Sequence, residues 1–167
     1  TEVADSAVAM MLAFARGTAI YDATLRENPT ANWTHTHNVT ARRLRGATYG
    51  VIGMGRIGTA SALRAKAFGM NVVFYDPYKR NGSDLALGIK RADSLAELFA
   101  QSDVVSLHAP SSEETRGLIG RDVFAAAKKG MILVNTARGA IVDIDALHDA
   151  MKDGIVLAAG LDVLPTE

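Results

Sequence analysis

Hydrophobic residues gather into six short runs that predict buried strands. The runs are dense in Val, Ile and Leu and lack polar alternation, as in parallel sheets covered on both faces. They occupy residues 48–52, 71–75, 89–91, 103–107, 131–135 and 156–160. Helix-like segments lie between them, at 56–68, 94–101, 121–128 and 143–153. Asp143 or Asp145 is expected to cap the last helix. This alternation predicts an α/β fold, a Rossmann-type doubly wound parallel sheet flanked by helices.

The beginning of the chain follows another pattern. Sequence rich in Ala, Met and Leu from Val3 to about Arg26 predicts one long N-terminal helix that ends before Asn28-Pro29. Apolar residues lie on more than one face of this helix, so we expect it to meet more than one partner surface. Residues 28–46 lack a periodic pattern and predict irregular structure, with Trp33 as its anchor.

Length and composition exclude several classes of protein. The 167 residues fit one domain. The 18 basic residues balance the 18 acidic ones, so the chain has no net positive charge that would attract nucleic acid, and we expect no contact with it. The absence of cysteine excludes disulfides and thiolate sites and is compatible with a reducing cytoplasm, where we expect the protein to be. The apolar run from Ala7 to Ala15 is far shorter than the roughly 20 residues of a membrane span, so we expect no membrane contact. Because the chain starts at Thr1 and stops just after a strand-like run, we expect it to be part of a longer polypeptide.

The most informative motif follows the first predicted strand. Gly53, Gly55 and Gly58 form a G-x-G-x-x-G string between that strand and the next helix, and Asp76 ends the following strand. This context is typical of a dinucleotide-binding turn. The first glycine permits the tight turn, the second leaves room for a pyrophosphate, and the third lets the helix approach the sheet. The amides of Arg56 and Ile57, at the helix N-terminus, then suit an anion.

Asp76 indicates which dinucleotide is preferred. Its carboxylate can accept hydrogen bonds from an adenosine ribose and would repel a 2′-phosphate, which favours NAD over NADP. Lys79 and Arg80 follow closely and would soften that preference. The structural alternative, a packing turn followed by a solvated aspartate, requires all these elements to coincide by chance. The sequence therefore predicts NAD as the cofactor.

A second group of polar residues follows the later strands. His108, Thr136, Arg138 and Asp162 each come shortly after a predicted strand. The carboxyl ends of parallel strands meet at one edge of a sheet, where open α/β sheets bind their ligands. We therefore expect these four residues to converge on the edge that carries the glycine turn.

Five segments together resemble a known family. They read GVIGMGRIG, FYDPY, SDVVSLHAP, LVNTARGAIVD and GLDVLPTE, in this order. The sequence is similar over essentially its whole length to the NAD-binding domain of the D-isomer-specific 2-hydroxyacid dehydrogenases, a family that includes phosphoglycerate dehydrogenases and C-terminal-binding-protein corepressors. The resemblance implies that residues 1–167 form one NAD-binding domain and that the substrate domain lies outside this chain.

The resemblance also assigns cofactor contacts. It implies that Arg56 and Ile57 contact the pyrophosphate and that Asp76 binds the adenosine ribose. The loop beside the adenine and its ribose matches His108, Ala109, Pro110 and the residues up to Thr115. The contacts near the nicotinamide ribose and carboxamide match Thr136, Ala137 and Asp162.

The resemblance implies a catalytic pair as well. Arg138 matches the arginine that holds the carboxylate and keto oxygen of a 2-keto acid, a task suited to its forked donors. Glu167 matches the glutamate that pairs with the catalytic histidine, which would raise the pKa of that histidine. None of the four histidines, at positions 35, 37, 108 and 148, fits the proton donor. We therefore expect the chain to bind NAD and to have little or no turnover alone.

Alternative functions differ in what surrounds this domain. A corepressor-like scaffold that senses NAD would contain the same glycine turn and the same arginine, so flanking sequence must discriminate it from an enzyme. A reductase of another class would need a Tyr-Lys pair after a middle strand, but all four tyrosines lie before residue 79.

His35 and His37 have no neighbouring acid or thiol to complete a metal site, so we expect no metal site there. The resemblance also implies a homodimer through the N-terminal helix.

Overall fold

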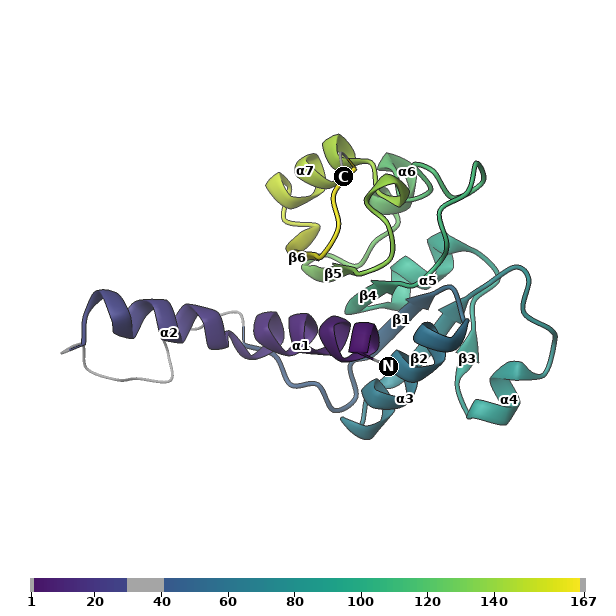
Figure 1. The fold of residues 1–167 in the computed structure, drawn as a ribbon, viewed down its shortest axis with the longest axis horizontal. Helices are drawn as coiled ribbons and strands as arrows, with labels where there is room; N and C mark the ends of the chain where they lie inside the picture. The colour runs from purple at the N-terminus through teal and green to yellow at the C-terminus, as the bar shows by residue number, and fades with distance from the viewer. Residues whose placement is uncertain (1, 30–40, 166–167) are drawn as a thin grey trace.

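The computed structural model describes residues 2–29 and 41–165. Its strands form one parallel sheet in the order β3-β2-β1-β4-β5-β6 (Figure 1). The strands are β1 (Thr48–Ile52), β2 (Asn71–Tyr75), β3 (Lys90–Arg91), β4 (Val104–Leu107), β5 (Met131–Asn135) and β6 (Val156–Leu161). This is the strand order of a doubly wound dinucleotide-binding fold, and it confirms the predicted fold class.

Helices cover both faces of the sheet. They are α1 (Glu2–Arg16), α2 (Thr18–Glu27), α3 (Arg56–Ala67), α4 (Ser83–Leu87), α5 (Leu95–Gln101), α6 (Arg121–Ala125) and α7 (Ile144–Lys152), with a 3-10 turn η2 (Gly139–Ile141). α1 and α3 pack on one face, whereas α5, α6 and α7 pack on the other. Successive residues of a strand point to opposite faces of the sheet. Ile132 therefore belongs to the core under α1 and α3, and Leu133 belongs to the core under α5, α6 and α7. This two-sided burial explains the apolar runs of the sequence.

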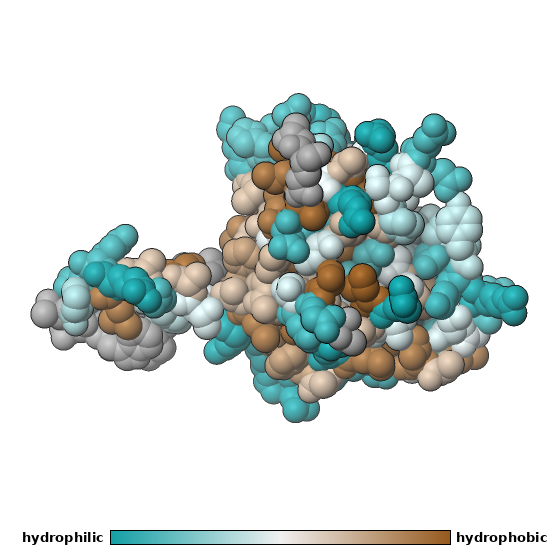
Figure 2. Space-filling view, viewed as in Figure 1, coloured by the Kyte–Doolittle hydropathy of each residue, from teal (hydrophilic) through white to brown (hydrophobic). Residues whose placement is uncertain are grey.

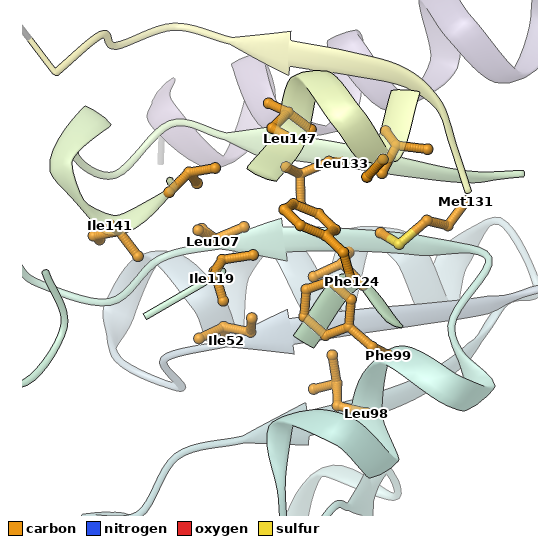
Figure 3. Packing of buried hydrophobic residues seen from close by; sticks show 14 of the residues in the cluster. Ile52, Leu98, Phe99, Leu107, Ile119, Phe124, Met131, Leu133, Ile141 and Leu147 are labelled. Atoms are coloured by element: carbon orange, nitrogen blue, oxygen red, sulfur yellow. The ribbon is translucent and has the colours of Figure 1, made fainter. Parts of the chain in front are cut away.

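The core on the α5–α7 face is a close-packed set of aliphatic and aromatic side chains (Figure 3). Phe99 of α5 and Phe124 of α6 meet edge to face, with ring centroids 6.1 Å apart and planes at 84°. Ile52, the last residue of β1, belongs to the same core. The end of β1, where the glycine turn begins, is therefore packed against this core.

Predicted helix caps and lengths are partly confirmed. Asp143 rather than Asp145 caps α7, because its carboxylate accepts from the Ala146 amide at 3.0 Å. Ser94 caps α5 in the same way. α6 ends at Ala125, earlier than the predicted 121–128. The short helix α4 and the turn η2 were not predicted, because segments of five and three residues are too short to show a helical period.

The N-terminal helix is present, but its prediction as one continuous helix from Val3 to Arg26 is wrong. Gly17 adopts a left-handed conformation with φ 66°, which ends α1 and starts α2. The two helices are bent by 61°. In the described part of the chain, only this bent pair taken together, and no single helix, has the length and apolar character of a membrane span. Trp33 lies outside the described residues, so its anchoring role stays a prediction.

Candidate functional site

The glycine turn joins β1 to α3 at the carboxyl edge of the sheet. Gly53 has φ 87°, and a Cβ on it would lie 2.7 Å from the backbone nitrogen of Ala109 in the loop after β4. A Cβ on Gly58 would collide with the Gly53 carbonyl oxygen. A Cβ on Gly55, in contrast, would meet no atom within 4 Å. Two glycines are thus required by packing, whereas the third leaves open space in front of the helix N-terminus.

Asp76, which the sequence analysis assigns to the adenosine ribose, lies against this turn. Its Oδ2 accepts from the Met54 amide at 2.8 Å, and its Oδ1 accepts from the Tyr78 amide at 2.9 Å. Lys79 also reaches the turn, because its Nζ donates to the Met54 carbonyl at 2.7 Å. The acid and the turn therefore form one unit, with a cation beside them.

A cavity of about 340 Å³ opens between the loops that follow β2 and β4. Its volume lies in the range of small-molecule sites. Apolar walls come from Ile52, Ala109, Pro110 and Leu118, and Gly53, Asp76 and Thr115 also line it. The cavity is suited to a flat heterocyclic ring bound next to a group that reaches Asp76.

A second hollow of about 500 Å³ lies over the start of α3, lined by Gly55, Arg56, Ile57 and His108. The first amides of a helix have no partner within the helix, and the helix dipole makes this end positive. The hollow therefore offers an anion-binding position beside the cavity, in the order that a nucleoside followed by a pyrophosphate requires.

His108 is held in a buried hydrogen-bond network at this hollow. Its Nε2 lies 2.9 Å from the Ser106 hydroxyl, and the buried Tyr49 hydroxyl lies 2.7 Å from that of Ser61 and also bonds to Ser106. Burial lowers the pKa of His108 to about 4 and raises the pKa of Tyr49. His108 is therefore neutral at pH 7. Its Nδ1 is buried and has no hydrogen-bond partner in the described part of the chain.

The lowered pKa of His108 predicts a loss of stability in acid. The unfolded chain, with a histidine pKa near 6.5, takes up a proton first as the pH falls, so the free energy of unfolding decreases between about pH 6.5 and pH 4. At pH 5 the decrease in the free energy of unfolding that comes from His108 is about 2 kcal/mol. His108→Gln should remove this part of the slope in urea unfolding at pH 7.5 and pH 5. His148→Gln, at an exposed histidine of α7, is the control. An unchanged slope in His108→Gln would contradict the prediction.

The loop after β5 is held by a residue that the sequence analysis did not single out. Asn135 is 1% exposed; its Nδ2 donates to the Arg138 carbonyl at 2.9 Å, and its Oδ1 accepts from the Ala137 amide at 3.0 Å. The Asp162 amide donates to the Asn135 carbonyl at 3.0 Å, which brings the end of β6 to the same place. Thr136 Oγ1 is buried and unpartnered among the described residues. The sequence could have pointed to Asn135, because it lies in the NTARG segment, which is part of the resemblance to the family.

Removal of the Asn135 amide should destabilise the domain. Asn135→Ala leaves the buried Ala137 amide without a partner and removes one of the two hydrogen bonds to the Arg138 carbonyl, and we expect a loss of about 2 kcal/mol in the free energy of unfolding. Asn71→Ala is the control, because it removes one exposed hydrogen bond to the Gly46 carbonyl and should cost less than about 0.5 kcal/mol. Urea unfolding measures both. Equal, small effects would show that Asn135 does not hold this loop.

The structure brings most of the predicted site residues to one edge of the sheet. Arg138 is exposed there, its guanidinium donates to its neighbour's carbonyl at 2.6 Å, and no carboxylate of the described residues pairs with it. Glu167, His35 and His37 lie outside the described residues. His148 lies on the surface of α7 beside Asp149. In the described ranges no group of three His, Asp or Glu residues is placed to hold a metal ion.

The residues present fit a dinucleotide. The open space at Gly55 lies before a helix N-terminus, and the cavity at Asp76 adjoins it. Two buried polar atoms, His108 Nδ1 and Thr136 Oγ1, have no partner among the described residues and lie in the loops that border this edge. A buried polar group without a partner is costly, and a bound ligand would offer one.

Comparison with known proteins agrees with this geometry. The chain matches the family model for the D-isomer specific 2-hydroxyacid dehydrogenase, NAD binding domain, over residues 8–167. D-3-phosphoglycerate dehydrogenase of Mycobacterium bovis is 44% identical over 164 residues, 98% of this chain and 30% of that protein. C-terminal-binding protein 1 of Caenorhabditis elegans is 39% identical over 166 residues, 97% of this chain and 23% of that protein. Apo D-mandelate dehydrogenase of Rhodotorula graminis is similar in structure, with a TM-score of 0.91 and 37% identity over 100% of this chain and 50% of that one.

The chain thus spans less than a third of these curated relatives and half of the crystallised one. The predicted resemblance and the predicted cofactor are confirmed at the level of the domain. From the family match and the fold together, the chain belongs to the D-isomer-specific 2-hydroxyacid dehydrogenase family, as its NAD-binding domain.

Proposed function

We propose that this chain is the cofactor domain of a dehydrogenase that interconverts 2-hydroxy acids and 2-keto acids. One observation carries the proposal: the Met54 amide donates to Asp76 at 2.8 Å, which joins the glycine turn and the acid around one cavity. The loop of Arg138 follows β5 at the same edge of the sheet. NAD supplies the oxidant or reductant when it is bound.

The cofactor would extend along the edge of the sheet. Asp76 would accept from the adenosine ribose, and the segment from His108 to Thr115 would border the adenine. The amides of Arg56 and Ile57 would bind the pyrophosphate. The nicotinamide end would reach the loop after β5 and the end of β6, where we place Thr136, Ala137 and Asp162.

Arg138 would bind the substrate. Its forked donors suit a planar carboxylate, and its charge would stabilise negative charge on a keto oxygen. Its exposure, with no carboxylate partner in the described part of the chain, supports this role. Glu167 would pair with a histidine of the substrate domain.

The chain by itself is expected to bind NAD without turnover. The proton donor to the keto oxygen must be protonated at working pH, but burial holds the pKa of His108 at about 4, and Ser106 already occupies its Nε2. Incubation of the chain with NADH and a panel of 2-keto acids should therefore leave the NADH absorbance unchanged. Clear oxidation of NADH would contradict this part of the proposal.

Asp76→Ala tests the cofactor site. We expect NAD affinity to fall at least about tenfold and NADP affinity to change less than about threefold, because only NAD has a free 2′-hydroxyl to donate to the carboxylate. Isothermal titration calorimetry measures both, with Asp84→Ala on α4 as a control for the loss of a surface carboxylate. Since Asp76 also bonds to the amides of Met54 and Tyr78, equal losses for the two dinucleotides would mean that it only holds the turn.

We also propose a homodimer through the N-terminal helices. α2 has no buried residue, yet Ile20 and Leu25 are 47% and 38% exposed on it. In the space-filling view this helix stands away from the body of the molecule (Figure 2). Apolar side chains exposed together in this way are typical of an interface. Light scattering at high concentration should show a dimer, and a monomer would count against the interface.

A cytoplasmic location and the absence of nucleic-acid contact stay predictions.

A corepressor-like scaffold is the second candidate function. The observation that favours it is the 39% identity to C-terminal-binding protein 1. Both functions use bound NAD, so binding cannot separate them. The discriminating experiment adds NAD to the domain together with its flanking sequence. Assembly without turnover of any 2-keto acid would favour the scaffold.

A further inference from the structure

Two side chains from different loops meet at the cavity beside Asp76. The Tyr78 hydroxyl, in the loop after β2, donates to the Glu114 carboxylate, in the loop after β4. Both residues line the same cavity as Asp76. Tyr78 is 78% exposed, so this pair lies at the outer side of the cavity, away from the buried wall made by Ile52. The pair therefore bridges the two loops across the space assigned to the adenosine.

Glu114 has acceptor capacity that no other group at the cavity and no proposed ligand contact already uses. The Thr115 hydroxyl donates to the Pro110 carbonyl at 2.7 Å and accepts from the Ser112 amide at 2.8 Å. Each oxygen of Asp76 accepts from a backbone amide, and its remaining acceptor sites are assigned to the ribose. Among the described residues, Glu114 has one side-chain hydrogen bond, which its Oε2 accepts from the Tyr78 hydroxyl. Its Oε1 is left as an acceptor at the cavity.

An ionised carboxylate accepts hydrogen bonds and cannot donate them. Among the polar atoms on the edge of an adenine ring, the exocyclic amino group is the donor. We propose that Glu114, oriented by Tyr78, accepts a hydrogen bond from this amino group and thereby determines the base specificity of the site. The inference rests on the proposed function, in that the adenosine half of NAD must occupy this cavity.

Tyr78 is a positioning residue in this arrangement. The hydrogen bond to Glu114 and the Glu114 charge raise the pKa of Tyr78, and the charge of Asp76 adds to them. The phenol therefore remains a donor at neutral pH. Its bond fixes one oxygen of Glu114 and leaves the other for the ligand.

The test varies the ligand and the protein together. Calorimetry compares NAD with nicotinamide purine dinucleotide, in which a hydrogen atom replaces the amino group of adenine. The wild-type domain should bind NAD about tenfold more tightly than the analogue. In Glu114→Ala, NAD affinity should fall to that of the analogue while the affinity of the analogue stays within about twofold of wild type. Tyr78→Phe, which keeps the ring and removes only the donor, should reduce the discrimination to about threefold.

Asp122→Ala is the control for the loss of an exposed acid, because Asp122 lies in the first turn of α6, outside the segment from His108 to Thr115, and does not line the cavity. It should preserve the tenfold discrimination. Discrimination that persists in Glu114→Ala, or an equal weakening of both ligands, would overturn the inference, since it would make Glu114 a wall residue only. Failure of the proposed cofactor site gives another result, because neither dinucleotide would then bind the wild-type domain.

Discussion

Gly55→Val is expected to weaken NAD binding at least about 100-fold while it changes the free energy of unfolding by no more than about 1 kcal/mol. The folded chain tolerates the side chain, because Gly55 has φ −77° and ψ −160° and a Cβ there meets no atom within 4 Å. The same space is where the proposed pyrophosphate approaches the amides of α3. Valine would fill it without disturbing the turn.

Calorimetry with NAD and urea unfolding of the same sample separate the two effects. Gly120→Val is the matched control, because Gly120 is also an extended N-cap residue, of α6, and a Cβ there has its nearest neighbour at 3.6 Å. This control should retain wild-type NAD affinity. Binding of NAD to Gly55→Val within about threefold of wild type would place the pyrophosphate elsewhere.

Gly58→Ala should have the opposite profile, with a large loss of stability. Helix propensity alone predicts a gain of about 0.5–1 kcal/mol for this change inside α3. Packing predicts a loss, because the new methyl group would overlap the Gly53 carbonyl oxygen and would also lie 3.2 Å from the Val51 side chain. A backbone atom of a tight turn cannot move aside as a flexible side chain can. We expect a loss of about 3 kcal/mol, near the upper end for overpacking.

For a domain of this size, that loss lowers Tm by about 10 °C. Differential scanning calorimetry measures it, and NAD affinity should fall together with Tm because the turn itself is displaced. A variant as stable as wild type, or more stable, would mean that propensity outweighs packing and that the close approach of α3 to the turn is not required.

The hydrophobic pattern predicted the strands well for a physical reason. A central parallel strand is covered on both sides, so most of its positions are apolar, and β5 is buried along its whole length from Met131 to Asn135. The glycine turn was also readable, because its chemistry depends on local sequence: a strand, three glycines and a helix. Asp76 was predicted from spacing alone, and the structure adds its contact with Met54.

Other features could not be read from the local residue pattern. Tyr78 and Glu114 are 36 positions apart, and no local pattern relates them. Asn135 ends an apolar strand, and its sequence position did not show whether its side chain is solvated or buried. The structure shows that the following loop turns back and forms hydrogen bonds with this side chain. Gly17 is one glycine in a helical pattern, which helices often tolerate, and the sequence did not show that it takes a left-handed conformation.

The sequence by itself determined the class of sheet, the position of the dinucleotide turn and the identity of the family, because burial on two faces and close backbone approach restrict residue types locally. Only the tertiary structure decided which acid caps α7, where the N-terminal helix breaks, and which polar side chains face one another across the cavity. The last of these depends on the sheet, which brings together two loops that are distant in sequence. The cap and the break depend on backbone conformations at Asp143 and Gly17 that these residue types allow but do not require.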